Sequence, residues 1–410
     1  MGKGGKYLNK GGAKPMKNNM ASQQRMPAPQ NQKPVKKEKK PMKKGKKIAL
    51  TIGIIFLVLI LVAVIGGVIY WNYLLGLMTR PEDAPVPEAT TSDIDQMLAE
   101  LTAPTEALET EPTGTTSPEE TWPEIVSDEN ITNIMLVGQS SRPGEDSLIA
   151  DTMILCSINR ETKTLTLTSL MRDLRLVWPK YVDTKGKTHS GNNRINMAYN
   201  MGYHWTQNKQ DSMDLMEAIV QHNFGVPVER TIEIDFDIFM KVVDLLGGVT
   251  VDISEEEYAY LKDNAKWLDE EGVHVGVNKL NGYHALCYAR IRKVGHGDYE
   301  RTERQREVIT SLLNNLKDMN ILKIHKLFTE IMPLITTDMT NQEITNYAFE
   351  FIPMLKDLKI QSQRIPYDGN QGYTQVEIDG TIDNQLTIPD IAAAAKWLQQ
   401  SIGMEVAETD

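Results

Sequence analysis

Cysteine and the common short catalytic motifs are scarce in this sequence. Cys156 and Cys287 are the only two cysteines among 410 residues. This number excludes a disulfide-rich scaffold and a CxxC metal site, and it leaves open either one bridge or two buried thiols. The chain contains no GxxxxGKS/T phosphate loop, no HExxH and no GxSxG, and its seven histidines show no ligand spacing. Nucleotide hydrolysis, zinc catalysis and elbow-serine hydrolysis therefore have no motif in their favour.

Positive charge is missing from most of the chain. The net charge is -11, with 44 basic and 55 acidic residues. Residues 1–47 hold fifteen Lys and Arg against the single Glu38, so the other 363 residues carry 29 basic and 54 acidic groups. This distribution excludes a uniform nucleic-acid-binding surface, and we expect no nucleic acid partner.

The first 71 residues are typical of a cytoplasmic tail followed by a membrane anchor. Residues 1–47 contain almost no large apolar side chain, which predicts a disordered tail. Residues 48–71 then run for 24 positions without a charge. As a helix this run is about 36 Å long, enough to cross a bilayer core of about 30 Å. A cleaved signal peptide is the alternative, but the apolar core of such a peptide is only about 7 to 15 residues long.

The lysines beside the apolar run predict its orientation. Eight of them lie between Lys36 and Lys47, whereas the other flank opens with Arg80 and then acidic residues. By the positive-inside rule, the N-terminus is expected in the cytoplasm and the C-terminal part of the chain outside it. We therefore expect a single-pass protein of the cell membrane, with its basic tail against anionic lipid.

The remaining chain is predicted to form a stalk and one folded domain. Residues 80–130 are rich in Pro, Thr and Glu, which favours an extended extracytoplasmic stalk. The domain is expected over residues 131–405. Short apolar, β-branched segments predict strands over 131–139, 152–158 and 164–170, the last two as a hairpin. Helical periodicity appears over 211–222, 237–246, 282–289, 302–316, 341–355 and 389–402. This mixture indicates an α/β or α+β sandwich.

The segment 290–306 stands out for its arginines. It places six basic and three acidic residues in seventeen positions of an otherwise acidic domain. Arg301, Arg304 and Gln305 share one face of a predicted helix, and Arg290 and Arg292 precede it. Because Arg binds phosphate bidentately without changing protonation, converging arginines predict a phosphate or pyrophosphate ligand. A solvated helix whose glutamates pair with these arginines is the alternative.

Two further arginines follow predicted strands. Arg142 and Arg172 lie where loops deliver side chains to a site, and Asp151 and Asp173 stand near them in the sequence. A carboxylate beside several arginines can hold a Mg²⁺ that bridges to phosphate oxygens, or it can orient the guanidinium groups. The sequence leaves both roles open.

These residues, in this order, resemble a known family. The segments NIMLVGQSSR at 133–142, ADTMIL at 150–155, SLMRD at 169–173 and RINMAY at 194–199 look like the opening of LytR-CpsA-Psr (LCP) domains. The resemblance continues through short motifs at 234–236, 243–249, 280–282, 288–292, 297–298 and 301–305. It covers residues 131 to 316, behind a short tail and one apolar run.

The resemblance implies an extracytoplasmic phosphotransferase of mainly Gram-positive cell envelopes. Such enzymes transfer a glycopolymer from a polyprenyl-pyrophosphate carrier to a peptidoglycan hydroxyl. The family fold is an α-β-α sandwich with a mixed central sheet and a tunnel for the prenyl chain, so we expect a deep apolar channel that ends at the arginines.

The resemblance also assigns roles to individual residues. It makes Asp151 the metal-associated aspartate, with Mg²⁺ as the cofactor. Asp173 orients Arg172 or accepts a proton from the incoming hydroxyl. Arg142 remains a further candidate for ligand contact. The implied pyrophosphate clamp, with Gln305 beside it, comprises Arg172, Arg290, Arg292, Arg301 and Arg304.

Two positions depart from the family pattern. Ser140 stands where the family usually has Asp, and Ile149 where it usually has Arg. Loss of a carboxylate weakens a Mg²⁺ site unless Glu145 or Asp146 replaces it. The alternative function is therefore a metal-deficient polyprenyl-phosphate-binding or regulatory protein of the cell envelope. A single-pass sensor is a third reading, which the absence of a foldable domain in the tail disfavours.

Overall fold

The computed structural model describes residues 65–83, 122–139, 148–378 except 267 and 269–271, and 381–405. The predicted tail over 1–47, residues 48–64 of the apolar run and residues 84–121 of the predicted stalk lie outside the described residues, as do Ser140 and Arg142. Within the described part of the chain, no helix combines the length and apolar character needed to span a membrane.

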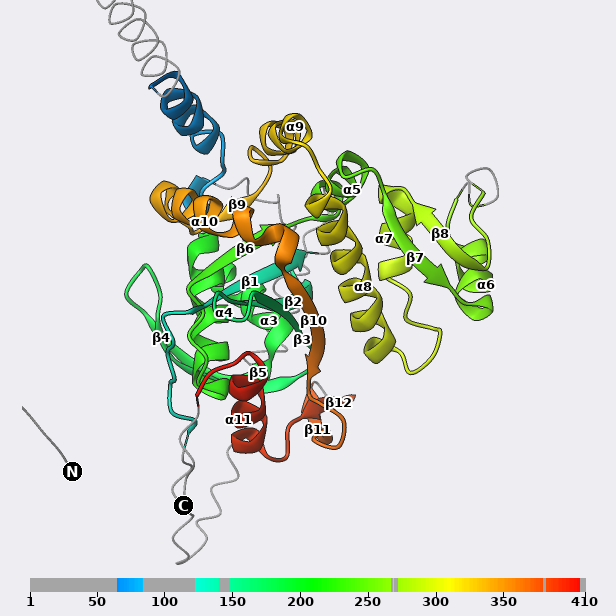
Figure 1. Cartoon of the computed structure of the whole chain (residues 1–410). Helices are drawn as coiled ribbons and strands as arrows, with labels where there is room; N and C mark the ends of the chain where they lie inside the picture. The colour runs from blue at the N-terminus through cyan, green and yellow to red at the C-terminus, as the bar shows by residue number, and fades with distance from the viewer. Residues whose placement is uncertain are drawn as a thin grey trace, which may run out of the picture. The chain divides into compact units, whose positions relative to one another are not determined.

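A six-stranded mixed sheet lies at the centre of the domain (Figure 1). Its strands are β1 (Ile131–Gln139), β2 (Ala150–Asn159), β3 (Thr164–Leu170), β6 (Arg230–Ile234), β9 (Thr336–Thr337) and β10 (Lys359–Ile365). Their order is β10-β3-β2-β1-β6-β9. β2 is antiparallel to both β1 and β3, β10 is parallel to β3, β6 is parallel to β1, and β9 is antiparallel to β6.

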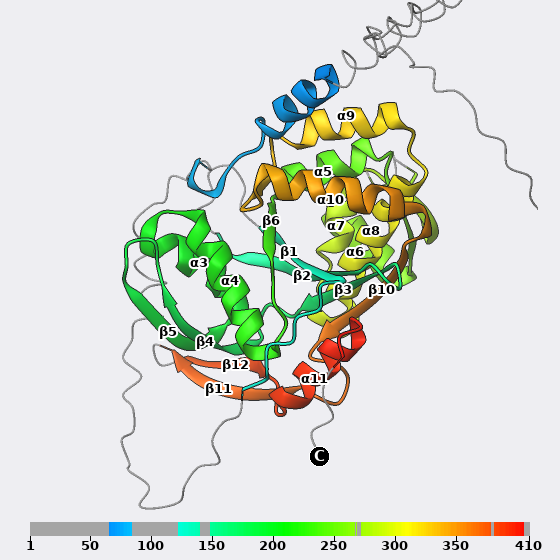
Figure 2. The ribbon, with the colours of Figure 1, turned by 60° about the vertical axis from the view of Figure 1, so that its left-hand side comes forward.

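Helices cover both faces of this sheet (Figures 1 and 2). One face packs on α3 (Ile195–Thr206), α4 (Lys209–Phe224) and α11 (Ile391–Ser401), and the other packs on α8 (Asp298–Lys317). Met153 and Leu155 of β2 belong to the first core, and Ile154 between them belongs to the core beside α8. Because both faces of β2 are covered at its centre, residues 153–156 of this strand form a continuous apolar run. The predicted α-β-α sandwich with a mixed central sheet is confirmed.

A smaller apolar core lies beside α8, on the side away from the sheet. It is built from α5 (Phe236–Leu245), β7 (Val249–Ile253), α6 (Glu255–Asn264), β8 (Gly276–Leu280) and α7 (Gly282–Ala289). Val308 of α8 belongs to this core, so the same helix is shared by both parts of the domain. A Cβ on Gly282 would lie 2.3 Å from the carbonyl oxygen of Met240, so only glycine permits this approach of α7 to α5.

The C-terminal part of the chain completes the same domain. β10 adds an edge strand to the central sheet, and α11 packs against its first face. Two antiparallel hairpins lie outside the sheet, β4 (Arg175–Val182) with β5 (Thr188–Arg194) and β11 (Gly372–Ile378) with β12 (Thr381–Thr387). The remaining elements are α9 (Ile321–Ile331), α10 (Asn341–Met354) and the 3₁₀ turns η1 (Pro81–Asp83) and η2 (Leu355–Asp357).

Residues 65–75, at the end of the predicted apolar run, are helical and contact α9 and α10 (Figure 2). The Tyr70 ring stacks on His325 of α9, with centroids 5.4 Å apart. Trp71 donates from Nε1 to Thr345 Oγ1 of α10 at 2.9 Å. The chain that leads into the domain is therefore fixed to two of its helices.

Neither cysteine forms a disulfide. Cys156 lies in β2, and burial raises the pKa of its thiol to about 12. A thiol with such a pKa stays protonated and unreactive at neutral pH. Of the two readings that the sequence leaves open, the unbridged one is correct.

Three carboxyl groups lie together where α4 meets the end of β9. Asp214, Glu217 and Asp338 each place an oxygen within 4.8 Å of the others. Burial raises the pKa of all three, and for Glu217 burial together with the charge of Asp338 raises it to about 8. Thr231 donates to Glu217 from its hydroxyl at 2.7 Å and to Asp338 from its backbone N–H at 2.8 Å. At neutral pH this cluster therefore holds at least one proton.

Replacement of Glu217 by Gln should change how stability depends on pH. The folded state keeps a proton that an unfolded Glu releases above its ordinary pKa of 4.5, so wild-type stability falls as the pH rises from about 4.5 to about 8. Glu217→Gln carries no such proton and keeps an oxygen for Thr231. We expect its melting temperature to exceed that of the wild type at pH 8 and to match it near pH 4.5. The exposed Glu256→Gln serves as the control, and an unchanged slope in Glu217→Gln would contradict the interpretation.

Candidate active site

The β2–β3 hairpin brings the first acidic and basic residues of the site together. Ile154 pairs with Ser169 in an antiparallel register, so residues before Ile154 lie opposite residues after Ser169. Asp151 at the start of β2 therefore meets Arg172, which follows β3. Arg172 Nη1 donates to Asp151 Oδ1 at 3.2 Å. Two residues far apart in the sequence thus share one end of the sheet.

The loop between α7 and α8 supplies the other side of the site. Gly297 has a φ of +76° and caps the start of α8, a left-handed conformation that favours glycine. Asp298 follows in the first helical turn, where its carboxylate is also favoured by the helix dipole. Arg301 lies one turn later, and Arg292 comes from the loop itself. The local turn therefore directs two arginines and one aspartate toward the β2–β3 end.

Three guanidinium groups surround two carboxylates in this site. Asp151 Oδ1 lies 3.2 Å from Arg172 Nη1, 3.8 Å from Arg292 Nη2 and 3.6 Å from Arg301 Nη2. Asp298 is 3.5 Å from Arg172, 3.3 Å from Arg292 and 3.1 Å from Arg301. Each carboxylate contacts all three arginines. Positive charges that would otherwise repel one another are thereby held in one place.

Several donors in this cluster lack a hydrogen bond. Among the described residues, Arg172 Nε, Arg292 Nη2 and Arg194 Nε are buried and find no acceptor within hydrogen-bonding geometry. Their nearest carboxylate oxygens lie at 3.5 to 3.9 Å, close enough for ion pairs only. A buried N–H without an acceptor is costly, so these groups are suited to an oxyanion from a ligand.

Burial and charge act differently on two of the arginines. Burial disfavours the charge on Arg172, but Asp173, Asp298 and Asp151 outweigh it and its pKa is raised. Burial lowers the pKa of Arg301, and Asp151 counters this only in part. Both stay charged at neutral pH, because an Arg begins from a pKa near 12.5. With Arg290 included, four guanidinium groups lie near three carboxylates, those of Asp151, Asp173 and Asp298, which leaves an excess of one positive charge for a ligand.

A cavity of about 380 Å³ ends at this cluster. Arg290, Arg292 and Arg301 line one end of it together with Asp151. The side chains along the rest of its wall come from α6 and α7 and are mostly apolar or aromatic: Tyr260, Leu261, Asn264, Tyr283, Leu286 and Cys287. Charged residues and side chains of α6 and α7 thus line one cavity, and the deep apolar channel expected from the sequence stays a prediction.

The structure brings together most of the residues that the sequence singled out. Asp151, Arg172, Arg292 and Arg301 form the cluster just described. Arg290 is exposed at the cavity, with its guanidinium 4.5 Å above the Phe236 ring. Asp173 lies beside the cluster and contacts Arg172 at 3.5 Å. Arg142 lies outside the described residues. Gln305 is buried on α8, 8% exposed.

Arg304 does not join the other arginines. Its side chain is 5% exposed, and Nε donates to Glu257 Oε1 of α6 at 2.5 Å. Its other nitrogens donate to the backbone carbonyls of Ile291 at 3.0 Å and Val294 at 3.4 Å. The sequence placed Arg304 in the clamp because it shares a helix face with Arg301, but the acidic residue of α6 and the carbonyls of the 290–297 loop bind it instead. Arg304 fixes the loop that carries Arg292.

Two site residues were missed in the sequence. Asp298 contacts three arginines, yet in the sequence it is typical of an acidic residue in a first helical turn; its one signal was the three-residue spacing to Arg301. Arg194, at the end of β5, lies 3.9 Å from Asp173 and pairs with Asp383 of β12. Arg194 begins the RINMAY motif at 194–199, which was its one signal in the sequence, because both of its partners are distant along the chain.

Within the described part of the chain, two groups of carboxylates offer the oxygen ligands that Mg²⁺ prefers. Asp151 and Asp298 lie at the end of the cavity, and their present partners are guanidinium groups. The donor chemistry fits a Mg²⁺ held by one or two carboxylates together with phosphate oxygens of a ligand. The cluster of Asp214, Glu217 and Asp338 lies elsewhere in the fold and retains protons.

Removal of the buried Arg304 should destabilise the protein. Arg304→Met leaves Glu257 as an uncompensated buried charge, which typically costs about 3–5 kcal/mol. Denaturant unfolding should show this loss for Arg304→Met. The double variant Arg304→Met with Glu257→Gln removes the charge and keeps the capping-box acceptor for Ser254, so it should recover most of the loss. Equal stability of the single variant and the wild type would contradict a positioning role for Arg304.

Comparisons with known proteins agree with this architecture. The profile of the LytR_cpsA_psr family matches residues 96–388. The chain is 29% identical over 183 residues to "Polyisoprenyl-teichoic acid--peptidoglycan teichoic acid transferase TagV" of Bacillus subtilis (strain 168), which covers 43% of this chain and 42% of TagV. It is 29% identical over 272 residues to "Polyisoprenyl-teichoic acid--peptidoglycan teichoic acid transferase TagU" of the same organism. That alignment covers 66% of this chain and 78% of TagU.

A solved structure supports the fold. The crystal structure of protein gbs0355 from Streptococcus agalactiae superposes with a TM-score of 0.51 at 23% sequence identity, and the match covers 68% of this chain and 91% of that one. The alignment with TagV spans less than half of that protein's length. The family profile covers well over half of the present chain, and the chain therefore belongs to the LytR_cpsA_psr family.

Proposed function

We propose that this protein transfers a glycopolymer phosphate from a polyprenyl-pyrophosphate carrier to a hydroxyl of peptidoglycan. One observation carries the proposal: three arginines, with N–H groups that lack acceptors on Arg172 and Arg292, surround two aspartates beside a cavity that Leu261 and Leu286 also line. The names of TagV and TagU, which describe transfer of teichoic acid to peptidoglycan, support the same class of reaction.

In this proposal the donor lipid lies along the cavity. Its pyrophosphate contacts Arg172, Arg292 and Arg301, and Arg290 reaches it from the exposed rim. The net positive charge of the cluster favours a phosphate-bearing ligand, and side chains of α6 and α7 contact the first part of the prenyl chain. The arginines stay charged throughout, so binding does not depend on a proton.

The acceptor hydroxyl then attacks the phosphorus that carries the glycopolymer. A new P–O bond to the acceptor forms while the bond to the bridging oxygen breaks, and polyprenyl phosphate leaves with the electron pair. Asp173 accepts the hydroxyl proton; the nearest guanidinium nitrogens lie 3.5 and 3.9 Å from its oxygens, longer than hydrogen bonds. The guanidinium groups stabilise charge that develops on the phosphoryl oxygens, since they are already in place before reaction.

We also propose that Asp151, with Asp298 beside it, holds Mg²⁺ through carboxylate oxygens when substrate phosphate is bound. The ion supplies Lewis-acid neutralisation of the departing lipid phosphate. Ile149 in this chain stands where the family usually has an arginine, and Ser140 stands where it usually has an aspartate. Asp151 and Asp298 together offer two carboxylates, although Ser140 stands in place of the usual aspartate.

The proposed location is outside the cytoplasm, on a single membrane-spanning segment with a cytoplasmic N-terminus. The eight lysines between Lys36 and Lys47 support this orientation. Tyr70 and Trp71 connect the end of the apolar run to α9 and α10. Such a connection would keep the cavity near the lipid phase that holds a polyprenyl carrier.

Transfer activity tests the main proposal. The full chain in detergent or nanodiscs, given a polyprenyl-pyrophosphate-linked saccharide, Mg²⁺ and peptidoglycan glycan, should release polyprenyl phosphate and form the glycan conjugate. We expect Arg172→Ala and Arg292→Ala each to reduce turnover by about 10²- to 10³-fold, since each removes preorganised charge stabilisation.

A matched control separates the general effect of removing a paired arginine from a specific effect on turnover at the site. Arg160 also pairs with a carboxylate, Glu350, but lies away from the cavity, so Arg160→Ala should keep near wild-type turnover. Donor binding by the wild type without any turnover would contradict the proposal in favour of the metal-deficient lipid-binding alternative.

The topology can be checked independently of activity. A cysteine introduced in the exposed α9 at Leu322 should react with a membrane-impermeant maleimide on intact cells, whereas one introduced at position 20 should react only after lysis. Leu322 is 76% exposed, so the substitution leaves the fold intact. Labelling of both positions, or of only position 20, on intact cells would contradict the proposed orientation.

A further inference from the structure

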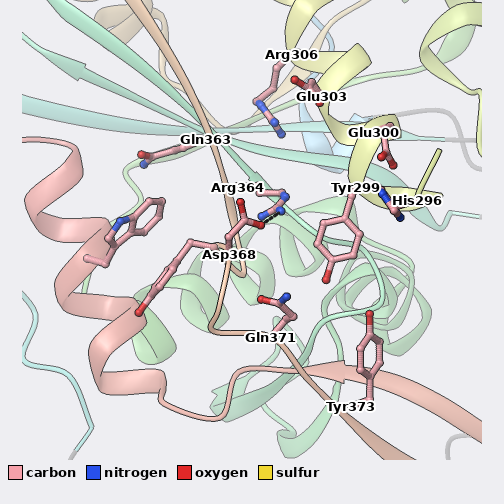
Figure 3. Close-up of a pocket in the computed structure, with 12 residues that line it drawn as sticks. His296, Tyr299, Glu300, Glu303, Arg306, Gln363, Arg364, Asp368, Gln371 and Tyr373 are labelled. Carbon is pink, nitrogen blue, oxygen red and sulfur yellow. Dashed lines mark hydrogen bonds and ion pairs between the residues drawn. The ribbon is translucent and has the colours of Figure 1, made fainter.

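A second, larger hollow lies on the other side of α8 from the arginine cluster. It has a volume of about 650 Å³ and is bounded by the start of α8, the end of β10, the turn that follows it, β11 and α11. Figure 3 shows side chains from these segments converging on it. We call this hollow the aromatic cleft, after Tyr299, Tyr367, Tyr373 and Trp397 that line it.

The rings in the aromatic cleft present both buried and exposed surfaces. Tyr367 and Trp397 lie 4.9 Å apart between centroids and pack partly on the main core. Tyr373 on β11 is 67% exposed, and its hydroxyl points toward that of Tyr299 (Figure 3). Tyr373 therefore offers an exposed ring beside three more buried ones, and Arg364 lies 4.5 Å from the centroid of the Tyr299 ring.

The polar groups of the cleft do not form a second anion site. Asp368 pairs with Arg364, which also donates to the carbonyl of Pro366 at 2.8 Å. Arg306 donates to serine hydroxyls at 2.6 and 2.8 Å. Glu300 and Glu303 line the same hollow, so three carboxylates face two guanidinium groups. The excess charge is negative here, opposite to that of the arginine cluster.

The remaining hydrogen-bonding capacity suits hydroxyl groups. Glu300 Oε2 is a buried acceptor with no hydrogen-bond partner among the described residues. Glu303 is exposed toward the cleft, and Gln371 lines its floor. Carboxylate and amide groups bind hydroxyls in plane, while aromatic faces pack on the C–H surfaces of a ring. A neutral polyhydroxylated ring is the chemical class that uses both features.

We propose that the aromatic cleft binds the saccharide that accepts the glycopolymer, namely a segment of peptidoglycan glycan strand. This inference rests on the proposed transferase function and adds the place of the acceptor to it. Asp298 and Arg301 occupy one face of α8 and belong to the arginine cluster. Tyr299, Glu303 and Arg306 follow the helical repeat on an adjacent face that borders the cleft.

The position of the cleft meets the requirement of the reaction. In-line displacement at phosphorus needs the attacking hydroxyl opposite the departing lipid phosphate. The lipid cavity and the aromatic cleft are lined by different faces of the first turns of α8. A glycan in the cleft would bring a hydroxyl past Tyr299 to a phosphate beside Asp298, the preceding residue, which lies 3.5 Å from Arg172.

Direct binding tests this inference without any need for turnover. The probe is a tetrasaccharide of alternating N-acetylglucosamine and N-acetylmuramic acid whose muramic carboxyl groups are capped as amides, so that it is neutral, and it is titrated calorimetrically into the full chain in detergent. Tyr373→Ala and Glu303→Ala, both at exposed positions, should each weaken binding roughly tenfold. Phe349→Ala removes an aromatic ring that is 77% exposed on α10, outside the cleft, and should not change binding.

Kinetics separates this inference from the transferase proposal. If both hold, Tyr373→Ala raises the KM for the glycan acceptor about tenfold and leaves the KM for the lipid-linked donor unchanged. Robust transfer with an unchanged acceptor KM in Tyr373→Ala would overturn the cleft assignment alone. Tetrasaccharide binding that is weakened by Tyr373→Ala supports the cleft even if no transfer is seen. Binding of lipid-free glycopolymer in place of the tetrasaccharide would overturn it.

Discussion

Mutual repulsion among guanidinium groups is the constraint on which this site depends. Two unit charges about 4 Å apart in a protein-like medium repel by roughly 4 kcal/mol. Arg172, Arg292 and Arg301 converge only because Asp151 and Asp298 each lie within 4.0 Å of all three. The aspartates offset enough of this repulsion to hold the arginines together. The site is therefore organised before any ligand arrives.

The fold provides this arrangement through one hairpin and one helix. The β2–β3 register brings Asp151 to Arg172, and α8 carries Asp298 and Arg301. Because α8 packs on the central sheet and on the smaller core, its first turn is fixed from two sides. Its separate faces border the lipid cavity and the aromatic cleft. One helix can thus align a lipid phosphate with an incoming hydroxyl.

Much of the fold could be predicted from local patterns in the sequence. The bounds predicted for β1, β3 and α7 coincide with the observed ones, because each is a continuous apolar or β-branched segment between clear turn residues. α3, α6 and α9 were not predicted. α6 is dominated by acidic and polar residues, so its capping box at Ser254 was the available signal. β5, β11 and β12 are largely polar, and Pro179 interrupts the apolar residues of β4, so periodicity does not reveal these two hairpins.

The site shows the same division between local and tertiary information. Residue type and spacing were enough to select Asp151, Arg172, Arg292 and Arg301. The different environment of Arg304 could not be predicted, because it depends on Glu257 of α6, 47 residues away. Asp298 and Arg194 were missed since their partners are set by tertiary packing. Sequence patterns identify which charges are available, and the fold decides which of them meet.

Binding of geranyl pyrophosphate to the full chain, compared with geranyl monophosphate, tests the central claim most directly. Calorimetric titration should show tighter binding of the pyrophosphate, because two phosphates can engage the three arginines and their N–H groups that lack acceptors. Arg292→Ala should weaken that binding by about tenfold or more, the worth of a charge-assisted hydrogen bond of about 1.5–3 kcal/mol. Equal affinity for both lipids, unchanged in Arg292→Ala, would contradict the account.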